Sequence, residues 1–221
     1  MIQIYKIIRI SLCILVVMCI PITYFYSIEE DINLSIEKNA IDLCIPIIEN
    51  DVICQQNNIT QIITTYNNKL STKDIIKITE AFYVASKTYT IPIDIILSVS
   101  ISESNFNPNV ISKEGARGIM QVMPRTLHLI KKKGKIKYKD PIVENIYVGS
   151  YYLNYLYDIT KIKFPNSEDK DIWKLVFMHY NYGDAAVDKY IKNKLPKSVI
   201  IYARRIMENS EKINKIIKQG C

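Results

Sequence analysis

The chain has 221 residues, of which 48% are hydrophobic and 23% are charged, and its formal net charge is +7. This length suits one compact domain with a short appendage and excludes two domains with separate cores. Only 6 Gly and 8 Pro are present, which excludes a long disordered or fibrous region. The positive charge fits nucleic acid, an anionic membrane or an anionic polymer, but no nucleic-acid-binding motif is present and we expect no nucleic-acid partner.

The amino terminus has the pattern of a membrane anchor. Lys6 and Arg9 precede an uncharged, largely apolar run over residues 10–28, which as a helix is about 28 Å long and can cross a bilayer. Acidic residues follow at 29–31, so the positive-inside rule places the rest of the chain outside the cytoplasm. We expect residues 1–28 to be an N-terminal transmembrane helix that binds the membrane. A cleaved or lipidated signal sequence is the alternative, but the small residues of a cleavage site are missing.

Three cysteines lie outside the apolar run. In an oxidising compartment Cys44 and Cys54, which are close in sequence, are predicted to form a local disulfide that leaves Cys221 unpaired. Three free thiols are the alternative. The two histidines have no neighbouring ligands in sequence, so we expect no metal and no other cofactor.

The next segments are a stalk and two helices. Residues 29–70 show no clear single period and are predicted to be a stalk or linker. A helix is predicted from Ser71 or Thr72 to about Tyr89, with a capping-box-like start and with apolar residues at helical spacing, namely Ile75, Ile78, Phe82 and Ala85. Pro92 opens a second helix that runs to Glu103.

Every later long segment is also helical. The predicted helices cover residues 143 to about 160, 172 to about 180, 185–192 and 197–217. The basic stretch 130–139 is predicted to be a small hairpin or a loop, and no alternating strand of useful length is present. The fold class is therefore all-α, with one mostly helical domain over residues 71–221.

Glu103 is the first candidate for chemistry. Ile96, Val99 and Glu103 are three and four residues apart, so the glutamate shares the apolar face of its helix. Burial there raises the pKa of a carboxyl group toward neutrality, which a general acid requires at physiological pH. The alternative is a glutamate at a frayed helix end or one paired with a lysine.

The residues from Glu103 onward form an ordered set of motifs. They are Glu103-Ser104-Asn105-Phe106-Asn107-Pro108, Ser112, Gly115-Ala116, Gly118-Ile119-Met120-Gln121, Met123-Pro124, Asp140-Pro141, Asn145-Ile146, Gly149, Tyr152-Leu153, Tyr180-Asn181-Tyr182-Gly183 and Tyr202. Over about residues 76–206 this pattern resembles the soluble lytic transglycosylase family, whose relatives include goose-type lysozyme. The resemblance implies a lysozyme-like helical domain. One departure is His179, where the family usually has alanine, and we interpret it as a structural histidine.

The resemblance also implies an activity. The family cleaves the β-1,4 bond between N-acetylmuramic acid and N-acetylglucosamine in peptidoglycan, so the expected partners are peptidoglycan glycan strands. Glu103 would protonate the leaving oxygen and then deprotonate the sugar's own 6-hydroxyl, which closes a 1,6-anhydro ring without water. The expected location is the bacterial cell envelope, with an inner-membrane anchor and the catalytic domain in the periplasm.

Further site residues follow from the same resemblance. Gln121 and Asn181 would hydrogen-bond the sugars, Met120 and Tyr180 would line the cleft, and Ser104 would contact the substrate. Tyr202 would hold Glu103 in position by a hydrogen bond. Met120, Tyr180 and Tyr202 also fit an interpretation as core residues. Three residues are read as turn formers of the cleft wall, namely Ser112, Gly115 and Gly118.

Two other functions remain open. A lysozyme-like hydrolase needs a carboxylate that directs water, and Met123 stands where goose-type enzymes tend to have aspartate, although Asp140 or Asp184 could serve instead. An inactive peptidoglycan-binding scaffold would not need to keep Glu103. The biological task is either general wall turnover or local opening of the wall, in which case a secretion or cell-envelope machine is a further partner.

Overall fold

The computed structural model describes residues 50–133 and 138–220. By its internal contacts the chain divides into two compact units, residues 1–54 and 55–221. Residues 50–54 are the described part of the first unit, and the second unit holds the other described residues. The predicted anchor over residues 1–28 lies outside the described residues. Among the helices that the structure does describe, none combines the length and the apolar character needed to cross a membrane.

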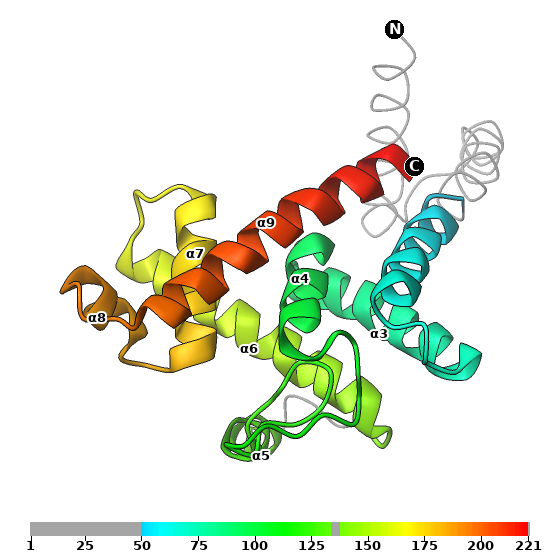
Figure 1. The fold of residues 1–221 in the computed structure, drawn as a ribbon, viewed down its shortest axis with the longest axis horizontal. Helices are drawn as coiled ribbons and strands as arrows, with labels where there is room; N and C mark the ends of the chain where they lie inside the picture. The colour runs from blue at the N-terminus through cyan, green and yellow to red at the C-terminus, as the bar shows by residue number, and fades with distance from the viewer. Residues whose placement is uncertain (1–49, 134–137, 221) are drawn as a thin grey trace, which may run out of the picture. The chain divides into compact units, whose positions relative to one another are not determined.

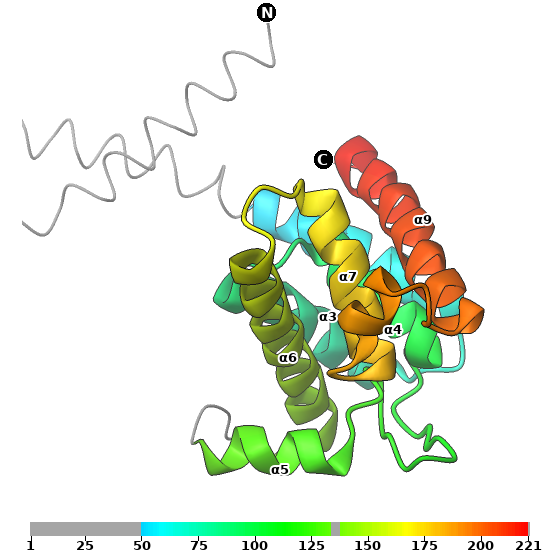
Figure 2. The same ribbon diagram turned by 90° about the vertical axis from the view of Figure 1, so that its left-hand side faces the viewer.

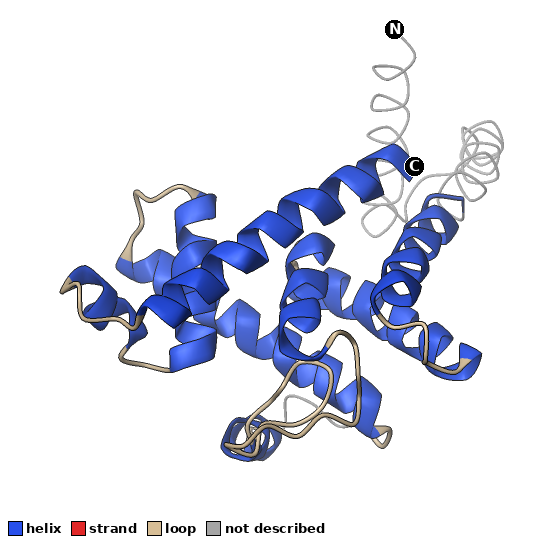
Figure 3. Cartoon of the chain, in the orientation of Figure 1, coloured by secondary structure: helices blue, strands red, loops and turns tan. Residues whose placement is uncertain are grey.

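The second unit is helical throughout (Figure 1). Residues 55–66 are helical, and the labelled helices are α3 (Thr72–Tyr89), α4 (Ile93–Ser104), α5 (Pro124–Lys132), α6 (Pro141–Lys163), α7 (Asp169–Tyr182), α8 (Ala186–Ile191) and α9 (Lys197–Gly220). Figure 3 shows helices joined by loops, and residues 50–133 and 138–220 contain isolated β-bridges but no strand. The predicted all-α fold of this domain is confirmed.

The predicted helix starts have the expected caps. The Ser71 hydroxyl accepts a hydrogen bond from the Asp74 N–H at 3.1 Å, which fixes the start of α3. The Asp140 carboxylate accepts bonds from the N–H groups of Ile142 and Val143 at 2.9 and 3.2 Å. With Pro141 in the first turn, this cap starts α6 two residues earlier than predicted.

Helix α5 corrects the structure predicted for the basic stretch. Residues 130–132 were predicted to be part of a hairpin or loop, but they form the last turn of this helix. Pro124 stands in its first turn, and Lys131 and Lys132 in its last turn complement the helix dipole. These signals are present in the sequence, but nine residues are too few to show a clear period.

The predicted stalk over residues 29–70 differs from the structure at its carboxyl end. Residues 55–70 belong to the same compact unit as the rest of the domain. Three isoleucines at helical spacing are buried in the core, namely Ile59, Ile62 and Ile63, and the hydroxyls of Thr60 and Thr79 form a hydrogen bond of 3.0 Å. The domain therefore begins well before residue 71, and residues 29–49 lie outside the description.

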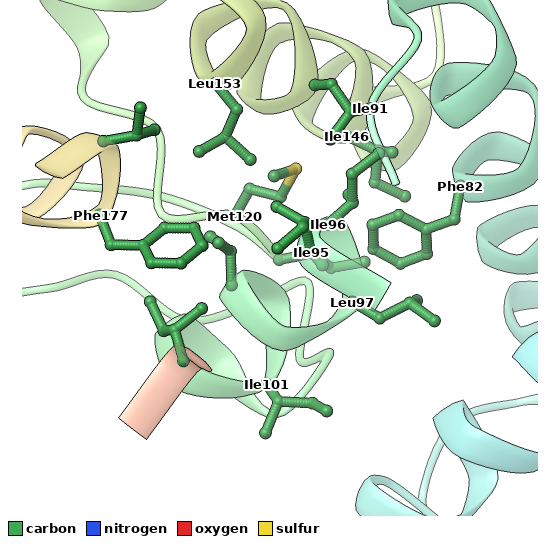
Figure 4. Close-up of a cluster of buried hydrophobic side chains, with 14 of the residues drawn as sticks. Phe82, Ile91, Ile95, Ile96, Leu97, Ile101, Met120, Ile146, Leu153 and Phe177 are labelled. Carbon is green, nitrogen blue, oxygen red and sulfur yellow. The ribbon is translucent and has the colours of Figure 1, made fainter. Parts of the chain in front are cut away.

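Helix α4 lies at the centre of the core. Every residue from 94 to 101 is buried, as expected for a helix enclosed on all sides. Helix α3 packs on α4, α9 crosses both α4 and α7 (Figure 1), and α7 lies between α6 and α9 (Figure 2). The hydroxyls of Ser98 and Ser100 donate to the backbone carbonyls of Asp94 and Ile96, so these buried polar groups are satisfied. Figure 4 shows part of this core, including Ile96 and Met120.

Cys54, in the described part of the first unit, is disulfide-bonded. The other four cysteines lie outside the described residues. The pairing of Cys54 with Cys44, which leaves Cys221 free, therefore stays a prediction.

Helix α6 approaches the loop between α4 and α5 closely at Gly149. A Cβ atom at this position would lie 2.5 Å from the Met120 sulfur and 2.7 Å from the Met120 Cβ. The hydroxyl of the next residue, Ser150, is 3.8 Å from the same sulfur. Glycine thus allows the buried Met120 side chain to pack directly on the α6 backbone.

This contact predicts the effect of Gly149→Ala. In an unhindered helix alanine is more stable than glycine by about 1 kcal/mol. Here the added methyl overpacks the core, and we expect a loss of about 1–3 kcal/mol in the free energy of unfolding, measured by urea denaturation. The control is Asp158→Ala on the exposed side of α6, which should change stability by less than about 0.5 kcal/mol. An unchanged Gly149→Ala variant would contradict the close approach of α6 to Met120.

Candidate active site

The end of α4 is fixed by an unusual turn. Asn105 and Phe106, which follow the helix, both have left-handed backbone angles, with φ of 49° and 59°. The Phe106 ring is fully buried, with its centroid 5.8 Å from that of Phe82 and 6.3 Å from that of Tyr66. Because this ring anchors the turn, the last turn of α4 is held in place, which contradicts a frayed helix end at Glu103.

The Glu103 carboxyl group is largely withdrawn from solvent. The Tyr202 hydroxyl, which comes from α9, donates a short hydrogen bond to Glu103 Oε1. Burial raises the pKa of Glu103 to about 7, although the Tyr202 hydrogen bond and the positive charge of Arg205 act in the opposite direction. This rise in the pKa of Glu103 has the direction predicted from the helix face, whereas Arg205 was not selected from the sequence.

Two buried tyrosine hydroxyls border this carboxyl group. Burial and the charge of Glu103 raise the pKa of Tyr202 well above its ordinary value, so this hydroxyl stays a hydrogen-bond donor. Burial and the same charge raise the pKa of Tyr180. The Tyr180 hydroxyl donates to the Met120 carbonyl at 2.7 Å, which ties the end of α7 to the loop after α4.

The loop over residues 105–123 is held from both sides. The Ser104 hydroxyl donates to the Ile119 carbonyl at 2.7 Å. The Asn145 side chain, from α6, accepts from the Met120 N–H at 2.9 Å and donates to the Arg117 carbonyl at 2.8 Å. Gly118 has a φ of 76°, and a Cβ there would lie 2.7 Å from the Asn145 amide carbon. The loop therefore requires glycine at this position.

The predicted turn formers occupy turns in the structure. The Ser112 hydroxyl accepts from the N–H groups of Glu114 and Ala116, each at 3.2 Å. Gly115 has a φ of 88° and its N–H donates to the Ser112 carbonyl at 3.0 Å. This turn shapes the loop after α4.

Two of the predicted substrate-binding residues have side chains that contact the loop and α6. The Met120 side chain is fully buried against Gly149, so it supports the cleft wall from behind. The Ser104 hydroxyl hydrogen is committed to the Ile119 carbonyl. Gln121 donates its amide hydrogens to the carbonyls of Val110 and Gly118 at 3.1 and 2.8 Å, which leaves its Oε1 to accept from a ligand.

A cleft of about 640 Å³ lies between the loop after α4, helices α5 and α6, and the end of α7. Three of the predicted residues line it, namely Gln121, Tyr180 and Asn181. Three tyrosines of α6 that sequence reasoning did not select line it as well, namely Tyr151, Tyr152 and Tyr155, and their spacing on one helix face was the available signal. Glu103 is not among the described lining residues. Tyr180 connects Glu103 to the cleft, because Tyr180 lines the cleft and the charge of Glu103 raises the pKa of Tyr180.

The two candidate second carboxylates differ in their surroundings. Asp140 caps α6 and pairs with Lys77 at 2.7 Å, and the Lys77 hydrogen bond lowers the pKa of Asp140. Asp184 is exposed, lines the cleft and lies 3.0 Å from Nε2 of the buried His179. Only Asp184 of this pair is therefore placed to meet a ligand. In the described part of the chain, no three His, Cys, Asp or Glu side chains are grouped closely enough to hold a metal ion.

Comparison with known proteins defines the family. A sequence model described as Transglycosylase SLT domain matches residues 80–200, which is more than half of the chain. The chain therefore belongs to the transglycosylase SLT domain family, and the resemblance seen in the sequence motifs is confirmed. A comparison with curated proteins found no match.

Similar solved structures are soluble lytic transglycosylases. The 70-kDa enzyme SLT70 from Escherichia coli is 25% identical, with a TM-score of 0.42, and an inactive mutant of Slt from Pseudomonas aeruginosa is 23% identical, with a TM-score of 0.42. A complex of the 70-kDa enzyme with bulgecin A gives 25% identity and a TM-score of 0.42. Each match covers 62% of this chain and 22% of the other chain, so this chain spans about a fifth of their length.

The raised pKa of Glu103 predicts a pH-dependent cost to stability. The carboxyl group ionises near pH 4.5 in the unfolded chain and near 7 in the folded protein, so the cost is absent below pH 4.5, grows between these values and is complete above 7. We expect Glu103→Gln to be more stable than the parent by up to about 3 kcal/mol at pH 8, with no difference at pH 4. Urea unfolding at both pH values measures this. The exposed Glu208→Gln is the control, and a gain for Glu103→Gln that is equal at pH 4 and pH 8 would contradict the assigned burial.

Proposed function

We propose that this chain is a peptidoglycan lytic transglycosylase that cleaves the β-1,4 bond between N-acetylmuramic acid and N-acetylglucosamine and leaves 1,6-anhydromuramic acid ends. The family membership supports action on peptidoglycan. The observation that carries the proposal is Glu103, a largely buried carboxyl group with a pKa of about 7 that is held by Tyr202. Such a group can both give and take a proton near neutral pH.

The proposed reaction uses this one carboxyl group twice. Protonated Glu103 donates its proton to the glycosidic oxygen as the bond between this oxygen and the anomeric carbon breaks. The resulting carboxylate, stabilised by Tyr202 and Arg205, then takes the proton of the 6-hydroxyl as that oxygen bonds to the anomeric carbon. The catalyst is regenerated, no water is consumed, and no second protein carboxylate is needed, unlike in most glycosidases.

The cleft supplies groups that suit a glycan strand. Gln121 Oε1 can accept from a sugar N–H or O–H, and the exposed Asn181 amide can both donate and accept. Tyr152 and Tyr155, which both line the cleft, stack on each other with ring centroids 6.4 Å apart, and such aromatic rings suit the apolar parts of a sugar. We assign Ser104 and Met120 to positioning the loop, which refines the roles predicted from the sequence.

Asp184 supports a second candidate function. It lines the cleft beside Tyr180 and Asn181, so it is the carboxylate that would direct water in a lysozyme-like hydrolase on this fold. The hydrolase and the transglycosylase both need Glu103, but they differ in product. A hydrolase leaves a reducing muramic acid end, which is heavier than the 1,6-anhydro end by one water.

The place of the reaction is also a proposal. Peptidoglycan lies outside the cytoplasm, which agrees with residues 1–28 as an anchor in the inner membrane and a periplasmic catalytic domain. A secretion or cell-envelope machine remains a proposed partner for local opening of the wall.

Glu103→Gln tests the proposed function. The substitution keeps the size of the side chain but removes its acid and base capacity, so activity on purified peptidoglycan should fall at least about a hundredfold. Mass spectrometry should find 1,6-anhydro ends in the parent digest. The control is Glu114→Gln, which removes another cleft-lining carboxylate and should keep activity within about tenfold.

Two results would overturn parts of this proposal. If the parent releases only reducing ends, and Asp184→Asn abolishes that release, the hydrolase replaces the transglycosylase. If Glu103→Gln cleaves at the parent rate, Glu103 is not the acid.

Tyr202→Phe gives a separate test through pH dependence. The Tyr202 hydrogen bond lowers the pKa of Glu103, so its removal should raise that pKa further. The loss of kcat/KM on the alkaline side, which for the parent should occur as pH rises through about 7, should move to higher pH in this variant. In the control Tyr180→Phe, whose hydroxyl binds the Met120 carbonyl, the alkaline limb should stay in place. An unshifted limb in Tyr202→Phe would show that this limb does not report Glu103.

A further inference from the structure

One wall of the cleft is basic. Helix α5 contributes Arg125 and Leu129 to the lining, and Lys133, directly after the helix, continues the same face at intervals of four residues. The Lys133 Nζ lies 6.0 Å from the ring centroid of Tyr155, which lines the facing wall from α6. Both cationic groups therefore border the space that the glycan strand would occupy.

The two cations of this wall have no ion-pair partner among the described residues. Lys131, on another side of α5, pairs with Glu144 at 2.7 Å. In contrast, Arg125 and Lys133 form no ion pair with any residue that the structure describes. The two acidic lining residues come from other elements, where Glu114 accepts a hydrogen bond from Ser112 at 3.1 Å and Asp184 lies beside His179. The α5 wall is thus a two-cation surface without an internal anion.

The chemistry of the substrate suggests what binds there. N-acetylglucosamine is neutral, and the lactyl carboxyl of each muramic acid is bound in an amide with the stem peptide. The negative charges of an intact strand therefore lie on the carboxylates of the stem peptides. Arg125 and Lys133 are eight positions apart, which on a helix is about 12 Å. A peptide of three to four extended residues covers this distance, since each extended residue spans about 3.3 Å.

We propose that Arg125 and Lys133 bind carboxylates of the stem peptide carried by muramic acid, so that α5 selects peptide-bearing strands. This inference rests on the proposed function for its substrate class. The two cations bind along the length of one stem while Gln121 and Asn181 contact the sugars. Lys133 is exposed beside the Tyr155 ring, so its ammonium group is accessible to a carboxylate in the cleft.

The test measures binding, because binding does not require turnover. Full-length chain with Glu103→Gln, which cannot cleave under the proposed function, is titrated with soluble, uncrosslinked peptidoglycan strands. The matched ligand is the same strands after their stem carboxylates have been converted to carboxamides with a carbodiimide and ammonia. Length and sugars are unchanged, and only the negative charge is removed.

The native strands should bind about tenfold more tightly than the amidated strands at low salt, and 0.5 M salt should reduce the difference. Adding Arg125→Gln and Lys133→Gln should weaken binding of native strands to the amidated level and leave amidated strands within about twofold. The matched control is Lys132→Gln, an exposed cation of α5 outside the cleft lining, which should change neither affinity. Circular dichroism checks that each variant is folded.

Equal affinity for both ligands in the starting protein would overturn the inference. So would a double substitution that weakens both ligands by the same factor, because the cations would then act on the sugars or on the fold. Failure of the proposed function is seen separately, as absence of 1,6-anhydro ends from the chain with Glu103 intact. The charge preference in binding is measured whichever way that product analysis ends.

Discussion

Enclosure of α4 on every side is the constraint on which the site depends. Residues 94–101 are all buried, so the helix cannot rotate or shift without opening the core. Its last turn carries Glu103, whose charge acts on Tyr180 in the lining of the cleft. The carboxyl group is therefore both fixed and poorly hydrated, and its pKa near 7 is a direct consequence of where a buried helix ends.

The motif that follows Glu103 acts mainly through backbone geometry. Phe106 anchors the turn, Ser104 and Asn145 hold the loop, and Gly118 leaves room for the Asn145 amide. These residues share the task of bringing the loop against α6 and the end of α7. In this chain the residues after Glu103 thus set the shape of a cleft wall, and Met120 is the clearest case because its side chain is fully buried.

What the sequence could predict was local. Helices α3 and α4 and the direction of the Glu103 pKa follow from spacing within about 30 residues. The features that local spacing could not show depend on contacts between distant segments. The burial of residues 55–70 needs α3, and the hydroxyl that binds Glu103 comes from α9, 99 residues away, so only the family resemblance could suggest it. Helix α5 was missed because a short helix has little periodicity to detect.

In the proposed reaction Glu103 acts first as an acid and then as a base, which requires a pKa between two limits. Burial alone would raise the pKa further and weaken the acid step, because the carboxylate left after proton donation would be poorly stabilised. Tyr202 and Arg205 oppose burial by favouring the carboxylate. Arg205 is exposed and its effect is screened by salt, whereas the buried Tyr202 hydroxyl is not. The hydrogen bond from Tyr202 is therefore the part of this balance that holds under all ionic conditions, and it ties the chemistry of α4 to the packing of α9.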